Sequence, residues 1–163
     1  MTALNRNPEK TNLLQPTKYV LTFSKLGAAQ YFCQQVNLPG VTLGEVVIPT
    51  PFLDMYSPGT KLTYNPLDVT FLVDEELEGW KQMYNWFTEI ADPDGFEPGK
   101  ESHLSDAMLT VLNAHNNPVL RINFKNCFPL TMSDLAFDTT SSAEQHISCS
   151  TTFRYESYKY LTL

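Results

Sequence analysis

The segment from Asn65 to Ile90 constrains the fold more than any other part of the chain, because it passes from strand periodicity to helix periodicity without a break. Its first residues alternate apolar side chains with smaller or polar ones, and this period of two is typical of a strand with one buried face. The apolar positions of this strand are Leu67, Val69, Phe71 and Val73. A strand that leads directly into a helix predicts a domain that contains both.

Asp74 is expected to end the strand and to be the N-cap of the helix, with Glu75 and Glu76 in the first turn, where the helix dipole favours negative charge. Apolar residues then recur at helical spacing, so one face of the helix must be buried. We expect three aromatic residues to anchor this face on the sheet of the same subunit. They are Trp80, Tyr84 and Phe87.

The length and the charge of the chain limit its class. The 163 residues suit one domain, residues 1–163, in which the polar and aperiodic residues 1–17 form an extended arm. The net charge of −7 argues against tight nucleic-acid binding, because proteins that grip phosphates need a basic surface. No apolar run approaches the roughly 20 residues that cross a bilayer, so no membrane anchor is expected. The first residues also lack the apolar stretch of a signal peptide, which predicts a cytoplasmic protein.

No catalytic motif is present in the sequence: there is no nucleotide-binding loop, nucleophile elbow or metalloprotease helix. His103, His115 and His146 have no second ligand at metal-site spacing. His103 and His115 lie in or beside predicted turns, so we expect both to be solvated. Three cysteines without CxxC spacing predict buried, reduced thiols rather than a disulfide or a metal site. We therefore expect no enzyme activity, no cofactor and no metal.

Residues 41–64 predict a long hairpin that projects from the body, with its turn at residues 57–59 and with Pro49 and Pro51 interrupting the first arm. Apolar residues near its tip would form an adhesive patch on a monomer, so we expect a neighbouring subunit to cover them. These residues are Ile48, Phe52, Leu53, Met55 and Tyr56. The alternative is a hairpin that folds back on its own core.

Further strand-like stretches cover residues 18–25, 31–36, 107–113, 119–128, 130–137 and 145–158. Roughly eight strands and one helix predict an α+β domain that is mainly antiparallel β. We expect a β-sandwich or barrel with one flanking α-helix and the projecting hairpin.

The last strands also have a polar face, on which small and basic residues alternate with buried ones. This face is either an ordinary outer sheet surface or the lining of an aqueous channel between subunits. The basic residues that could lie in such a lumen or at a subunit boundary are Arg121, Lys125 and Arg154.

The order of these segments resembles the tail-tube proteins of contractile-tailed bacteriophages, from about Asn12 to Tyr155. The resemblance rests on the NLPG turn at 37–40, the long hairpin, the strand NPLDVTFLVDEE before a Trp-containing helix, the segment NCFPLTMSDLAFD at 126–138 and the closing TTFRY at 151–155. It is similar to the tube-fold domains of baseplate hub proteins as well. The implied fold is the phage tail-tube fold.

This resemblance implies a structural virion protein of the phage tail, assembled in the host cytoplasm. Six copies would form a ring, and the rings would stack into an inner tube for DNA ejection, in contact with tail sheath and with baseplate or hub proteins. The hairpin and the N-terminal arm would make the contacts between subunits and rings. DNA would pass without specific binding, so we expect Arg121, Lys125 and Arg154 to pair with acidic groups at subunit boundaries or to face outward.

Three functions remain open at this point. The first is a ring of the tube body, and the second is an adaptor ring of the same fold, such as a tube initiator in the baseplate hub or a tail-completion ring. The third is a cytoplasmic β-barrel that binds a small apolar ligand, which predicts a stable monomer with an enclosed pocket.

Overall fold

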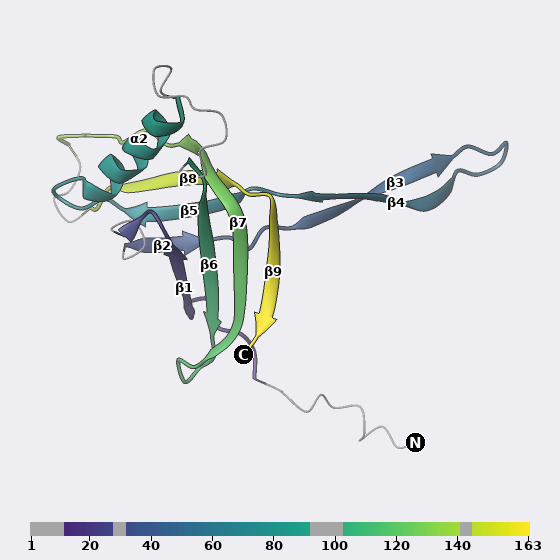
Figure 1. The fold of residues 1–163 in the computed structure, drawn as a ribbon, viewed down its shortest axis with the longest axis horizontal. Coiled ribbons are helices and arrows are strands. Elements are labelled where there is room, and N and C mark those ends of the chain that lie inside the picture. Colours follow the sequence, from purple (N-terminus) through teal and green to yellow (C-terminus); the bar gives the residue numbers. More distant parts are fainter. Residues whose placement is uncertain (1–11, 28–31, 92–102, 141–144) are drawn as a thin grey trace.

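The computed structural model of the protein describes residues 12–27, 32–91, 103–140 and 145–163. These residues contain nine strands and the helix α2 (Figure 1). The elements in chain order are β1 (Tyr19–Phe23), β2 (Cys33–Val36), β3 (Val41–Ile48), β4 (Met55–Tyr64), β5 (Leu67–Leu72), α2 (Glu78–Ala91), β6 (Ser105–Leu112), β7 (Pro118–Met132), β8 (Ser148–Arg154) and β9 (Ser157–Thr162).

Seven strands form one antiparallel sheet in the order β1-β6-β7-β8-β5-β2, and β9 pairs with the first part of β7. The long strand β7 belongs to both halves of this sheet: β1, β6 and β9 run across the direction of β2, β5 and β8 (Figure 1). The bent sheet thus makes two layers, and it stays open because β1 and β2 end the strand order. The predicted antiparallel sandwich with a flanking helix is confirmed, whereas a closed barrel is absent from the described residues.

The bend of the sheet coincides with irregularities in β7. Asn126 has a φ of 54°, and the pairing of β7 with β8 shifts register between Pro129 and Thr131. A proline, which has no N–H to donate, is tolerated at such a bulge. The sequence predicted two strands separated at this proline, but the structure has a single strand of 15 residues that bends instead of ending.

The predicted strand 145–158 is divided in the opposite sense, into β8 and β9. The division lies where the Glu156 N–H donates to the Lys125 carbonyl, 3.0 Å away, so the chain turns onto the edge of β7. This turn adds β9 to one half of the bent sheet and leaves β8 in the other half.

The core lies between the two halves of the sheet and α2, and the ring of Phe153 is near its centre. This ring is 4.8 Å from that of Phe23 on β1 and 6.0 Å from that of Trp86 on α2, which joins three elements. Cys127 and Cys149 are buried as free thiols, as the sequence predicted, and Cys33 is partly buried. Burial raises the pKa of Cys127 to about 12, so this thiol stays protonated at neutral pH.

The helix begins later than expected. The Asp74 carboxylate accepts from the N–H groups of Glu78, at 3.0 Å, and Gly79, at 3.3 Å, and these bonds lower its pKa. Asp74 therefore caps α2 through its side chain, as predicted. A turn separates it from the first helical residue, and Leu77, which directly precedes the helix, has a φ of 54°. Such a φ is unusual for a residue other than glycine.

The buried face of α2 is shifted from the predicted one. Met83 and Trp86 are the large residues that are fully buried, and the Trp86 Nε1–H donates to the His103 carbonyl at 2.8 Å. Trp80 and Phe87 are partly buried and pack against the core. Tyr84, expected among the anchors, is instead half exposed and stacks on Trp80 with 5.3 Å between ring centroids.

Candidate assembly surfaces

The hairpin of β3 and β4 stands apart from the rest of the molecule. The two strands pair only with each other and extend away from the body (Figure 1). Every residue of β3 is exposed, in contrast to the alternating burial of β5. The alternative that the hairpin folds back on its own core is therefore wrong.

The register of the hairpin corrects the predicted turn. Val41 pairs with Tyr64 and Ile48 pairs with Met55, so the chain reverses at residues 49–54, where both prolines of the first arm lie. Residues 57–59, expected to form the turn, belong to β4 opposite a register shift in β3.

Two glycines allow this register shift. A Cβ on Gly59 would lie 2.6 Å from the Gly44 carbonyl oxygen, which is closer than side chains approach backbone. A glycine inside a strand often marks such a close approach of two backbones. The pair Gly44 and Gly59 is therefore a signal in the sequence that these two arms face each other.

An aromatic cluster holds the root of the hairpin. The ring of Tyr64, the last residue of β4, is 5.9 Å from Tyr155 and 5.2 Å from Tyr158. The Tyr155 hydroxyl donates to the Asn65 carbonyl at 2.8 Å, and burial raises the pKa of Tyr155 to about 12. The hairpin thus leaves a well-packed root although its length is exposed.

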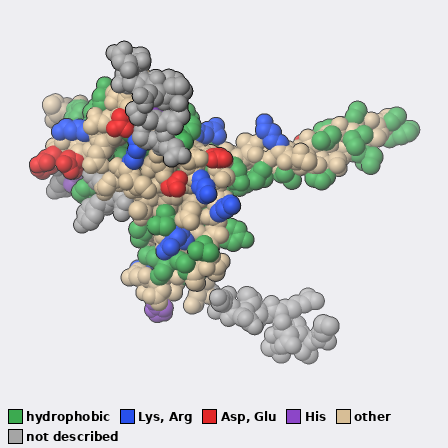
Figure 2. All heavy atoms as spheres, in the orientation of Figure 1, with side chains coloured by type: hydrophobic (Ala, Val, Ile, Leu, Met, Phe, Trp, Pro, Cys, Tyr) green, Lys and Arg blue, Asp and Glu red, His purple; other side chains and the backbone are tan. Residues whose placement is uncertain are grey.

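The tip of the hairpin is apolar and exposed to solvent. Phe52 is 99% exposed, and the tip forms a patch of hydrophobic side chains at the far end of the molecule (Figure 2). The other exposed tip residues are the predicted ones, Ile48, Leu53, Met55 and Tyr56. Large apolar patches on soluble proteins typically mark interaction sites.

A polar surface covers the side of β5 and β8 that faces away from the core. Its short side chains bond to one another across the strands: the hydroxyls of Thr70 and Ser150 are 3.0 Å apart, and the Thr152 hydroxyl donates to Asp68 Oδ1 at 2.9 Å. These bonds leave a face of short, mutually satisfied groups. Arg154 lies at the end of the same face and donates to the Tyr64 carbonyl at 3.3 Å, at the root of the hairpin.

The structure does not bring the three basic residues together. Arg121 and Lys125 lie on β7, on the half of the sheet that β6 and β9 flank, whereas Arg154 is on β8. Among the described residues there is one salt bridge, between Lys25 and Glu89 at 3.1 Å. No described carboxylate therefore pairs with Arg121, Lys125 or Arg154. Arg121 is partly buried with its Nε unpaired, and Lys125 is exposed beside Ser157.

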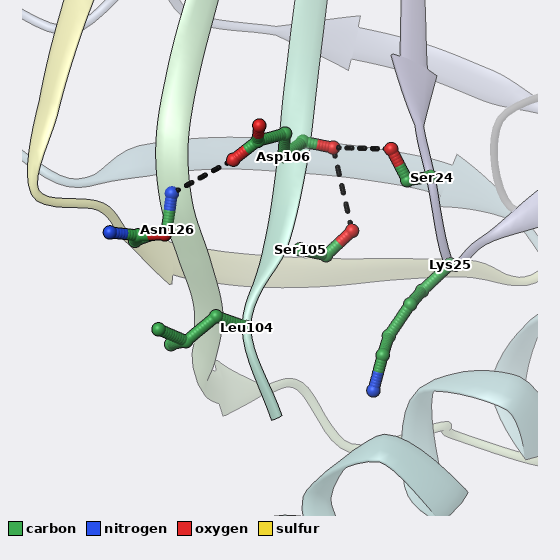
Figure 3. Close-up of a pocket in the computed structure, with 6 residues that line it drawn as sticks. All are labelled: Ser24, Lys25, Leu104, Ser105, Asp106 and Asn126. Carbon is green, nitrogen blue, oxygen red and sulfur yellow. Dashed lines mark hydrogen bonds between the residues drawn. The ribbon is translucent and has the colours of Figure 1, made fainter. Parts of the chain in front are cut away.

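A hollow of about 480 Å³ lies between the end of β1 and the start of β6 (Figure 3). Its polar groups are engaged locally: Asp106 accepts from the Asn126 N–H at 3.1 Å, and the Ser24 hydroxyl donates to the Asp106 carbonyl at 3.3 Å. Lys25 extends toward α2 instead, where it pairs with Glu89. The hydroxyls of Ser24 and Ser105 both donate to the Asp106 backbone carbonyl and not to its carboxylate.

The histidines form no site with one another. His115 and His146 are exposed, but both ring nitrogens of His103 are buried without a hydrogen-bond partner, so the prediction that His103 is solvated was wrong. The described part of the chain contains no cluster of His, Cys, Asp or Glu suited to a metal ion. Of the helices that the structure describes, none has the length and hydropathy of a membrane span.

Comparison with known proteins gives the family. The sequence profile of the family "Phage tail tube protein" matches residues 12–161. Over 152 residues the chain is 26% identical to the tail tube terminator protein of Enterobacteria phage T4, a match that covers 88% of this chain and 86% of that protein.

Solved structures agree on the fold. The chain is similar to the tube-terminating cap of the anti-feeding prophage, with a TM-score of 0.67, 15% identity and 100% of both chains covered. It is also similar to a chain in the sheath–tube complex of the PVC extracellular contractile injection system, with a TM-score of 0.62, 12% identity and 93% of each chain covered. The chain belongs to the phage tail tube protein family.

Proposed function

We propose that this protein forms a hexameric ring that terminates the inner tube of a contractile phage tail. The observation that carries the ring is the hairpin, whose apolar tip packs against no surface of the residues that the structure describes. Leaving such side chains in water forgoes about 1.5–3 kcal/mol for each large one. A ring of identical copies covers every tip by the same contact, repeated until it closes.

The terminal position is supported by the relative from phage T4, which is a tail tube terminator, and by the likeness to a tube-terminating cap. A terminator has one end that binds the last tube ring and another end that stops further stacking. Its partners would therefore be a tube ring, the tail sheath and the next component of the tail, and its place would be the virion.

A ring of the tube body is the second candidate, because the fold also resembles a chain in a sheath–tube complex. The two candidates differ in self-assembly. A body ring stacks on further copies of itself, whereas a terminator ring stops after one ring or binds only the end of a tube made of another protein.

The polar face of β5 and β8 is the best candidate for the channel lining. Its hydroxyls bond to one another, and its charges are one carboxylate, Asp68, and one cation, Arg154, at the end of the face. Such a surface would hold DNA weakly, since tight binding depends on cations that displace counterions from the phosphates. Arg121 and Lys125 then lie on the other half of the sheet, where they would pair with acidic groups of a neighbouring subunit. The ring acts as a passive conduit and not as an enzyme.

Light scattering and electron microscopy of the purified chain test this proposal. A mass of six chains and rings without tubes are expected, and long tubes of the chain alone would favour the tube body. The double variant Phe52→Ser, Tyr56→Ser should stay folded and monomeric, because both side chains are exposed in the single chain. Rings formed by this variant at the wild-type concentration would contradict the role of the hairpin.

A further inference from the structure

An apolar groove lies between the start of α2 and the segment that follows β7. It has two hollows, of about 240 and 420 Å³, and both are lined by Leu77, Leu135 and Phe137. Val73 and Ile147 add apolar wall on one side, and Trp80 and Met132 on the other.

Phe137 is the most exposed apolar residue of this groove. It is 75% exposed, while Leu135 beside it packs against the core. Polar groups, among them Glu75 and His146, line one edge of the groove. An apolar floor with a polar rim is the usual anatomy of a protein interface.

The groove and the hairpin tip lie on opposite sides of the body. The segment after β7 runs to the side where α2 starts, whereas β3 and β4 point the other way (Figure 1). The tip therefore cannot reach the groove of its own chain. If the hairpins of a ring run along its circumference, each tip points at the groove side of the next copy, and this head-to-tail arrangement can close into a ring.

The length of the hairpin suits this reach. The eight residues of β3 span about 26 Å at about 3.3 Å per residue, compared with a radius of gyration of about 15 Å for a compact chain of this size. The tip thus extends well beyond its own body and onto the facing side of a neighbour.

The exposed apolar area of the tip also favours a contact with a neighbouring copy. Buried aromatic side chains cover about 150–250 Å² each, so Phe52 and Tyr56 together would supply roughly 300 Å². Other exposed apolar residues of the hairpin, namely Ile48, Leu53 and Met55, add further area to the contact, for which a standard interface buries roughly 800 Å² per partner.

We propose that the groove formed by Leu77, Leu135 and Phe137 receives the hairpin tip of the next copy, with Phe52 as the inserted residue. This inference rests on the proposed ring and names the surface that closes it. Phe137 then contributes to the contact between copies, although it is largely exposed in the single chain.

Cysteine cross-linking tests the contact directly. Phe52→Cys and Phe137→Cys are combined in a Cys33→Ser background, since Cys127 and Cys149 are buried. Mild oxidation should give a ladder of covalent species up to six chains, and each single-cysteine variant should give none above a dimer. Rings visible by electron microscopy without this ladder would overturn the groove assignment and leave the proposed ring intact.

A second variant measures the strength of the contact. Phe137→Ser should raise the concentration at which rings form about tenfold or more and leave the melting temperature unchanged, because Phe137 is exposed. Tyr160→Ser is the matched control: Tyr160 is 73% exposed on β9, outside both the groove and the hairpin, and its change should leave ring formation as it is. Equal effects of the two changes would contradict the inference, and the absence of rings from the wild-type chain would overturn the proposed function together with it.

Discussion

The strands β5 and β3 are built from similar residues but have opposite environments. In β5 (LDVTFL) every second residue is buried, whereas in β3 (VTLGEVVI) all eight residues are exposed. Both sequences favour strands because they are rich in β-branched and aliphatic residues. The difference is that β5 lies between β2 and β8, whereas β3 has only β4 beside it.

This contrast separates two kinds of hydrophobic residue in one chain. The apolar residues of the body stabilise the fold of a single copy, and those of the hairpin are available to stabilise an assembly. An isolated two-stranded hairpin is at best marginally stable in water, so a neighbour would order it as well as cover it. Changes in the two regions should therefore alter different measurable quantities.

The largest expected effect belongs to the body. Trp86→Ala should lower the free energy of unfolding by about 3–5 kcal/mol, because it empties a buried site beside Phe153 and removes the hydrogen bond to the His103 carbonyl. Chemical denaturation of the unassembled chain measures this loss. Tyr84→Ala on the same helix is the control, and its effect should be much smaller because Tyr84 is half exposed. Equal losses would break the distinction between buried and exposed residues on α2.

A smaller effect is expected from Gly59→Ala in the hairpin. Its Cβ would meet the Gly44 carbonyl oxygen at 2.6 Å, and relief of such a clash typically costs about 1–3 kcal/mol. Because the hairpin is separate from the core, the cost should appear as weaker ring formation, with the thermal unfolding of the body unchanged. Gly44→Ala is the matched control, since its Cβ would have ordinary contacts starting at 3.4 Å. A lower melting temperature for Gly59→Ala alone would mean that hairpin and body unfold together.

The smallest expected effect is the contribution of Asp74 to the stability of the body, which depends on pH. Hydrogen bonds from the Glu78 and Gly79 N–H groups lower the pKa of Asp74 below its ordinary value of 3.8. A lowered pKa in the folded state means that the stabilisation is complete above 3.8 and is lost as the pH falls below it. Asp74→Ala should thus melt earlier than the wild type at pH 7, and the difference should shrink in acid. A difference that persists in acid would show that the carboxylate charge is not its source.

Much of the fold could be predicted from local pattern. The strand at Leu67, the helix after Asp74 and the long hairpin follow from periodicity and capping chemistry. The hairpin turn was misplaced because a proline–glycine pair normally marks a turn. Here Pro58 and Gly59 instead lie within β4 beside a register shift, and Pro58 pairs with Glu45, 13 residues earlier. The predicted break at Pro129 was wrong for a similar reason. A proline would normally end a strand, but here it lies at a bulge, and β7 bends and continues.

The candidate site was only partly predictable. The exposed tip could be anticipated, because five large apolar residues crowd a segment that contains two prolines. The groove around Phe137 could not, since it joins Leu77 to Leu135 and Phe137 across more than fifty residues of sequence. Periodicity describes single elements, and a surface between distant elements depends on how they pack. The shifted face of α2 has the same origin, because the burial of Met83 and Trp86 depends on how the helix packs on the sheet.

A cryo-electron microscopy map of the assembled particle tests the central claim most directly. We predict a six-fold ring in which the hairpin tip around Phe52 packs against the neighbouring copy, while Trp86 and Phe153 keep the contacts they have in the single chain. A ring in which the hairpins extend into solvent and the copies meet only through their bodies would contradict the account.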